Sequence, residues 1–69
     1  MASKTLGERV RDLREATAMS QAQLAERAGM AVGYLAIIEG GQLQRVSPAI
    51  VQRLARALNV HVERLVDGK

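Results

Sequence analysis

The sequence predicts an all-α fold, a compact single domain of five short helices. Three observations predict it. The chain has only 69 residues, enough for one small core. Its apolar residues recur at intervals of three and four, which is the period of a helix. Helix-start and helix-stop signals separate these periodic segments. The sequence has no cysteine, so neither a disulfide nor a thiolate metal site can stabilise the core. We expect one domain over residues 1–69, with a frayed start at residues 1–4.

The first helix is expected to run from about Leu6 to Ala16. Thr5 and Glu8 match the S/T-x-x-E capping box, which satisfies free backbone N–H groups at a helix start. Gly7 is unfavourable in a first turn, by roughly 1 kcal/mol relative to Ala. The core face has apolar residues at positions i, i+4 and i+7, namely Leu6, Val10 and Leu13.

The chain is organised around residues 20–39, which read as two short helices joined by a tight turn at Gly29. A helix pair with a short turn that contains glycine has the form of a helix-turn-helix. Ser20 and Gln23 make a second capping box, which puts Gln21 at the first helical position with its side chain free to reach outward. The next helix is expected from about Ala31 to Glu39. Each helix has a narrow apolar face, made of Leu24, Ala25 and Ala28 in one and Leu35 and Ile38 in the other.

The last third of the chain predicts two more helices after a loop at residues 40–46. Ser47 and Pro48 read as an N-cap followed by proline at the first helical position. Asn59 can adopt the left-handed conformation that ends a helix. A short fifth helix is expected over His61–Val66.

Composition narrows the possible functions. The net charge is +3 and the isoelectric point is about 10.2, which fits either a polyanion-binding module or a well-solvated small domain. Tyr34 is the one aromatic residue, which argues against stacking of single-stranded bases. With His61 as the one histidine, and no nucleophile–base pair or phosphate loop, we expect no enzyme, metal or cofactor. Neither a signal peptide nor a membrane span is apparent, so we expect a cytoplasmic protein.

Four segments give the chain a resemblance to the Cro/C1-type (XRE family) helix-turn-helix regulators over residues 6–68. They are LGERVRDLRE, MSQAQLAERAG, the Ile38-Glu39-x-Gly41 ending, and RLARALNV followed by VERLVDG. The resemblance implies a lambda-repressor-like fold and a nucleoid-associated transcriptional regulator. It also implies a repressor or controller that binds a pseudo-palindromic operator on double-stranded DNA as a homodimer, with its third helix in the major groove.

The resemblance also assigns expected roles to residues. The implied DNA contacts are Gln21, Ala31, Val32, Gly33, Tyr34, Ala36, Ile37, Gln42, Gln44 and Arg45. Arg14 and Glu39 match a family ion pair that locks the recognition helix against the first helix. Val60, Val62 and Leu65 are implied dimer contacts, with a plain core role as the alternative.

The third helix departs from the family pattern. Its sequence AVGYLAII has no charged residue before Glu39 and one hydrogen-bonding side chain, that of Tyr34. Readout of bases normally uses bidentate hydrogen bonds, each worth about 1–3 kcal/mol of discrimination. Three interpretations are open. The helix contacts thymine methyls and backbone, it docks a protein partner through an apolar face, or its register is shifted by one position so that some of these groups are buried.

Overall fold

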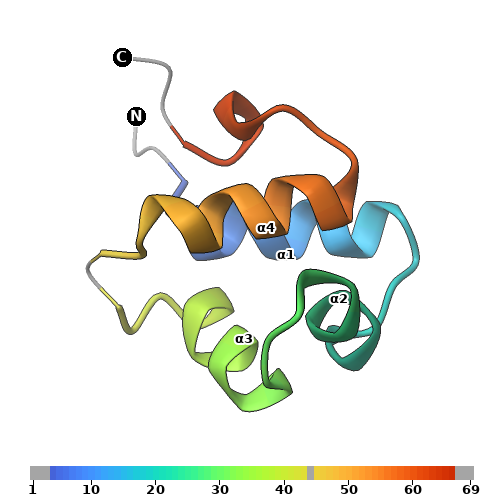
Figure 1. Ribbon diagram of the computed structural model, residues 1–69. Helices are drawn as coiled ribbons and strands as arrows, with labels where there is room; N and C mark the ends of the chain where they lie inside the picture. The colour runs from blue at the N-terminus through green and yellow to red at the C-terminus, as the bar shows by residue number, and fades with distance from the viewer. Residues whose placement is uncertain (1–3, 44, 67–69) are drawn as a thin grey trace.

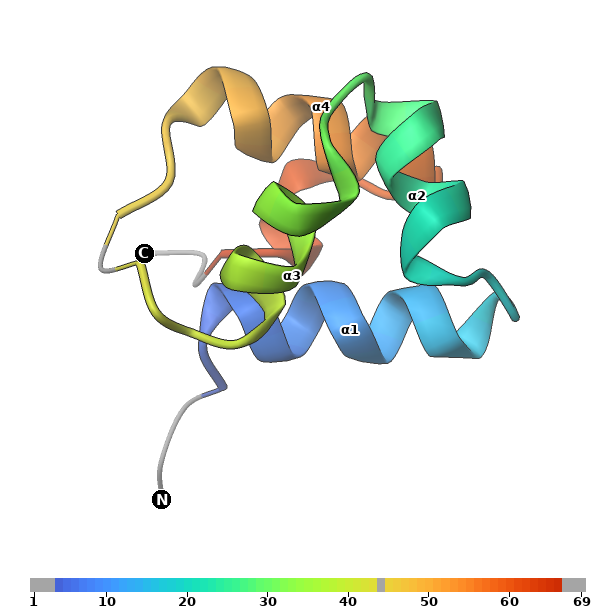
Figure 2. The same ribbon diagram turned by 90° about the horizontal axis from the view of Figure 1, so that it is seen from below.

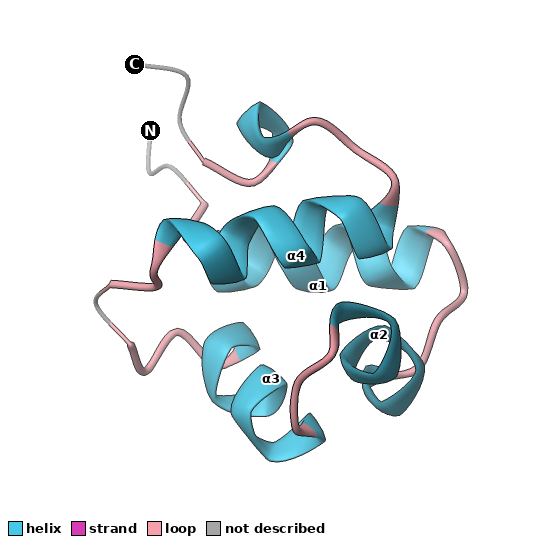
Figure 3. Cartoon of the chain, viewed as in Figure 1, coloured by secondary structure: helices cyan, strands magenta, loops and turns pink. Residues whose placement is uncertain are grey.

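The computed structural model describes residues 4–43 and 45–66, and these ranges contain four α-helices and one 3-10 turn but no strand (Figure 3). The elements are α1 (Leu6–Ala16), α2 (Gln21–Ala28), α3 (Val32–Glu39), α4 (Pro48–Leu58) and η1 (Val62–Arg64). Helices α1 and α4 run in the same direction along the molecule, with α2 and α3 on one side and η1 on the other (Figures 1 and 2). None of the described helices is long and apolar enough to cross a membrane.

The helix ends follow the local chemistry of the sequence. Both expected capping boxes form, at Thr5–Glu8 and at Ser20–Gln23. Ser47 caps the start of α4, with proline at its first position. Gly29 ends α2 at φ 71° and Asn59 ends α4 at φ 60°, both in the left-handed region. These predictions from sequence are confirmed.

The expected fifth helix is wrong in extent, because the segment forms a single 3-10 turn, Val62–Arg64. Its backbone bonds run from Arg64 N to His61 O and from Leu65 N to Val62 O, each 2.9 Å. The His61 side chain makes no capping bond, so the turn starts without the side-chain support that begins α1, α2 and α4. One turn is enough to bring Leu65 into the core with no exposed surface.

Every element contributes to one hydrophobic core. Its buried members are Val10, Leu24, Ala25, Ala28, Leu35, Ile38, Val51, Leu54, Ala55, Leu58 and Leu65. Met19 and Met30 pack against its edge, as expected for flexible side chains that fill gaps. From α3 only Leu35 and Ile38 enter this core, Glu39 is the one other buried residue, and the remaining residues of the helix are exposed.

Close packing of α1 against α3 requires glycine at position 7, although glycine is a poor helix former. Gly7 is buried where α1 passes the end of α3, and a β-carbon built there would lie 2.0 Å from the carbonyl oxygen of Ile38. No side chain fits at that distance, so glycine allows the two helices to approach. The sequence interpretation of Gly7 as merely unfavourable missed this role.

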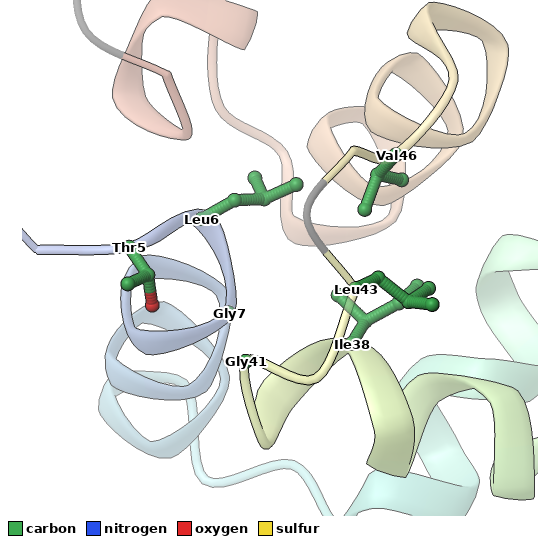
Figure 4. Close-up of a pocket in the computed structure, with 7 residues that line it drawn as sticks. All are labelled: Thr5, Leu6, Gly7, Ile38, Gly41, Leu43 and Val46. Carbon is green, nitrogen blue, oxygen red and sulfur yellow. The ribbon is translucent and has the colours of Figure 1, made fainter.

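A hollow of about 370 Å³ lies beside this contact, between the start of α1 and the chain that follows α3 (Figure 4). Its lining residues are Thr5, Leu6, Gly7, Ile38, Gly41, Leu43 and Val46. The one polar side chain among them, Thr5, already accepts the Glu8 N–H at 3.1 Å. The lining therefore lacks the convergent polar groups that fix a small ligand.

Candidate nucleic-acid interface

The turn between α2 and α3 sets the angle of the candidate recognition helix. Gly29 reverses the chain, and Met30 N donates to Ala25 O at 3.0 Å, which closes the end of α2. Ala31 is the extended N-cap of α3 and makes no side-chain capping bond. Its carbonyl accepts from Leu35 N at 3.2 Å, which starts the helix one residue later than Ala31 itself.

Helix α3 has two different faces. Leu35, Ile38 and Glu39 are buried against the rest of the domain. The residues assigned to base reading are all exposed, namely Ala31, Val32, Gly33, Tyr34, Ala36 and Ile37. Val32 keeps 47% of its surface exposed and Ile37 keeps 41%. The helix therefore has the expected register, and the one-position shift considered from sequence is excluded.

A bidentate ion pair fixes α3 to α1. Arg14 Nε donates to Glu39 Oε2 at 2.7 Å, and Arg14 Nη2 donates to Glu39 Oε1 at 3.1 Å. The Glu39 side chain is 3% exposed and that of Arg14 is 12% exposed, so both charges need this pairing. The bond to Glu39 raises the pKa of Arg14 despite the opposing effect of burial, so the guanidinium stays charged. Arg14 Nη1 also donates to Met19 O at 2.8 Å, which ties the start of the motif to the same group.

The Gln21 side chain does not reach freely outward, so that sequence expectation is wrong. Its Nε2 donates to Glu39 Oε1 at 3.0 Å, and the residue is half-buried. A buried carboxylate accepts more bonds than one arginine supplies, and Gln21 lies at the start of α2 within reach of it. The family resemblance had paired Glu39 with Arg14 alone, and nothing in the spacing of 18 residues identified Gln21 as a second donor. Gln21 thus links α2 to α3 as Arg14 links α1 to α3.

The loop residues assigned to phosphate contact are only partly described. Gln42 and Arg45 are exposed on the chain between α3 and α4. Gln44 lies outside the described residues. An exposed guanidinium and amide beside the end of α3 have the chemistry of phosphate contacts, which position a protein on DNA without reading sequence.

The three expected dimer contacts separate into two kinds. Leu65 has no exposed surface within the single chain, so it belongs to the core and its assignment to a dimer seam is wrong. Val60 and Val62 are half-buried. Val62 also lines a mostly apolar groove of about 300 Å³ between α4 and η1, together with Val46, Pro48, Val51, Gln52 and Val66. In Figure 1, η1 lies on the opposite side of α4 from α3.

The described residues contain no cluster of three or more His, Cys, Asp or Glu that could hold a metal ion. The geometry does present a short helix that α1 and α2 hold through Glu39, with an uncharged face toward solvent. The one acidic residue of α3, Glu39, is buried and paired with arginine.

Comparisons with known proteins agree with this architecture. The family described as a helix-turn-helix domain matches residues 5–67. The HTH-type transcriptional regulator SinR of Bacillus subtilis (strain 168) is 33% identical over 64 residues, which are 93% of this chain and 58% of SinR, so the chain spans less than two thirds of that relative. The restriction-modification controller protein C.AhdI from Aeromonas hydrophila superimposes with a TM-score of 0.82 at 37% identity, over 87% of this chain and 89% of C.AhdI. SinR in complex with DNA superimposes with a TM-score of 0.87 at 32% identity, over 91% of this chain and all of that one (100%). The chain therefore belongs to the helix-turn-helix domain family, among regulators of the Cro/C1 type.

Proposed function

We propose that this chain is the DNA-binding domain of a transcriptional regulator, a repressor or controller, that inserts α3 into the major groove of double-stranded DNA. The observation that carries the proposal is the anchoring of α3 by Arg14 and Gln21 through Glu39, which leaves a solvent-facing helix rigidly placed. A relative with the same fold, SinR, has been solved with DNA. A recognition helix must be held in this way, because readout of bases depends on a fixed docking geometry.

Phosphate contacts supply the affinity in this proposal. The start of α2 presents backbone N–H groups, and Gln42 and Arg45 extend from the loop beyond α3. Gln21 contributes either by positioning α3 or by exchanging Glu39 for a phosphate. The net charge of +3 favours association with a polyanion.

The regulator acts as a homodimer in this proposal, and the apolar groove between α4 and η1 supports a seam that includes Val62. A two-fold dimer places its recognition helices about 34 Å apart, so each meets one half of a pseudo-palindromic site. Val62→Asp is expected to give a monomer, and far-UV circular dichroism checks that it stays folded, because Val62 also packs against the core. Sedimentation velocity on both proteins tests this, and an unchanged oligomeric state would remove the seam from the proposal.

Selection from a random-sequence duplex library at two salt concentrations tests the DNA-binding function directly. We expect a two-fold symmetric motif, with affinity that falls steeply with salt because each neutralised phosphate adds about 0.9 to the slope of log K against log salt. Arg45→Ala should weaken binding to all sequences. Arg64→Ala is the matched control, since it removes the same group from η1, on the other side of the molecule. Affinity that stays flat between the two salt concentrations would refute the mechanism.

The alternative is a protein-interaction module that docks a partner on α3. The observation in its favour is the exposed apolar surface of Val32 and Ile37. It predicts no binding to duplex DNA even at low salt, together with partner capture that Ile37→Glu abolishes. Salt-sensitive DNA binding by the unaltered chain would exclude it as the main function.

A further inference from the structure

The solvent face of α3 includes four neighbouring positions without a polar side chain, in addition to the exposed Tyr34. Val32 pairs with Ala36, and Gly33 pairs with Ile37, each at a spacing of four residues that puts side chains together on a helix. A β-carbon built at Gly33 would meet no atom within 4 Å, so the space in front of this face is open. These four positions offer methyl and methylene groups and no side-chain hydrogen-bond donor or acceptor, whereas the exposed Tyr34 beside them carries a hydroxyl.

The size of this face argues against a protein partner. Helix α3 has 8 residues, so it is about 12 Å long. A stable protein interface buries about 800 Å² on each partner, far more than the three exposed large hydrophobic side chains of α3 provide, which are Val32, Tyr34 and Ile37. The phosphate-binding groups proposed above lie on both sides of it, at the start of α2 and in the loop. DNA would therefore meet charge and amide groups at the flanks and apolar groups at the centre.

The major groove offers one apolar group for such a face, the C5-methyl of a pyrimidine. Thymine presents it beside the O4 acceptor, whereas guanine, adenine and cytosine present polar atoms. An apolar face placed on those polar edges would remove them from water without new hydrogen bonds, which is unfavourable. Contact with a methyl group instead buries apolar surface on both sides.

Building on the proposed DNA-binding function, we propose that α3 reads pyrimidine C5-methyl groups, with Val32 and Ile37 as the specificity-determining contacts. Gly33 lets the methyl groups approach the helix backbone between them. Thymine and 5-methylcytosine carry the same methyl and differ at the position-4 group, O4 against N4–H₂. No side chain on the Val32, Gly33, Ala36 and Ile37 face can tell these two groups apart. The protein should therefore accept either base at a methyl-reading position.

Three forms of one random-sequence duplex library test this inference. The first contains thymine, the second has deoxyuridine in place of every thymine, and the third has deoxyuridine together with 5-methylcytosine in place of every cytosine. Deoxyuridine removes the methyl group and leaves every hydrogen-bonding atom of the base. We expect a thymine-centred motif in the first library, no motif in the second, and a motif centred on 5-methylcytosine in the third.

Duplexes from the first selection then measure the effect of each methyl. Each thymine-to-uridine change at a contacted position should weaken binding about fourfold, which corresponds to one buried carbon group. Val32→Ala should lose part of this discrimination, because it shortens the contacting side chain at an exposed helical site where the fold is not at risk. Arg45→Ala is the control, and it should weaken thymine and uridine duplexes equally.

The outcomes separate this inference from the function on which it rests. Equal binding of thymine and uridine libraries, with salt-sensitive affinity in both, would overturn methyl reading and leave the DNA-binding function standing. Binding to none of the libraries would overturn both. Sensitivity to uridine without rescue by 5-methylcytosine would overturn the equivalence of the two methylated bases, because some group would then be reading position 4.

Discussion

Two glycines in helices provide a sharp test of the packing, because the same substitution should have opposite effects at each. Replacing glycine by alanine within a helix stabilises it by about 1 kcal/mol from backbone propensity alone. At Gly33 the new β-carbon meets no atom within 4 Å, so Gly33→Ala should gain that amount. At Gly7 the β-carbon would lie 2.0 Å from the Ile38 oxygen and 3.0 Å from the Glu39 oxygen.

The magnitude at Gly7 follows from this distance. A carbon atom and a carbonyl oxygen approach to about 3.3 Å, so α1 and the end of α3 must separate by about 1.3 Å. Both atoms in the contact belong to backbone, so no side-chain rotation relieves it. Forced displacement of this kind in a packed interior typically destabilises by about 1–3 kcal/mol or more. The separation also strains the Arg14–Glu39 pair, which joins the same two helices. We expect Gly7→Ala to lower the free energy of unfolding by about 2 kcal/mol after the helix gain is counted.

Thermal and urea unfolding, followed by far-UV circular dichroism, measure both variants against the parent. In a domain of this size 1 kcal/mol corresponds to about 4–8 °C in Tm. Gly33→Ala should therefore melt several degrees higher than the parent, and Gly7→Ala about 8–16 °C lower. A Gly7→Ala protein that gains stability as Gly33→Ala does would refute the close approach of α1 to α3 and the reasoning built on it.

Two further substitutions test the anchoring of α3 through Glu39, and a third tests the turn between α1 and α2. Gln21→Ala should lower the free energy of unfolding by about 1–2 kcal/mol, because it removes one of the bonds to a buried carboxylate. Unchanged urea unfolding would mean that this side chain faces solvent. Glu39→Gln should destabilise by about 3–5 kcal/mol, because the Arg14 charge would lose its partner, and a Tm near that of the parent would contradict the pairing. Ala18→Gly should raise Tm by a few degrees, because Ala18 has a φ of 58°, a conformation unfavourable by about 1–2 kcal/mol for residues other than glycine. A lower Tm would show that this turn carries no strain.

Sequence predicted the helix boundaries well, because they depend on neighbours in the chain. The capping boxes, the turn at Gly29 and the stop at Asn59 each involve residues at most five positions apart. The left-handed conformation of Ala18 carried no such signal, since alanine rarely adopts it. The fifth helix failed because Leu65 reaches the core after one 3-10 turn, and tertiary burial decided its length.

The candidate site was harder to predict, because its geometry depends on pairs of residues far apart in the chain. Gln21 was assigned an outward side chain from its position after a cap, whereas the Glu39 carboxylate, brought there by folding, accepts its N–H. Gly7 was judged by helix propensity alone, although its role depends on where α3 ends. The exposed face of α3 was predicted correctly because the buried positions Leu35 and Ile38 already determined its opposite side.

Gly33 lies in open space and on the face proposed to read methyl groups. A substitution there should therefore raise the stability of the domain and weaken its recognition of DNA. Because nothing within 4 Å limits a β-carbon there, packing does not explain the glycine, and its absence of a side chain lowers helix stability. If α3 reads methyl groups close to its backbone, the added β-carbon in Gly33→Ala should push them away. We therefore expect this variant to melt higher and yet to bind thymine duplexes more weakly, while salt-sensitive binding to uridine duplexes stays the same. Higher stability with equal or tighter thymine binding would show that no base approaches the helix at this position, and that α3 contacts DNA through Val32 and Ile37 alone.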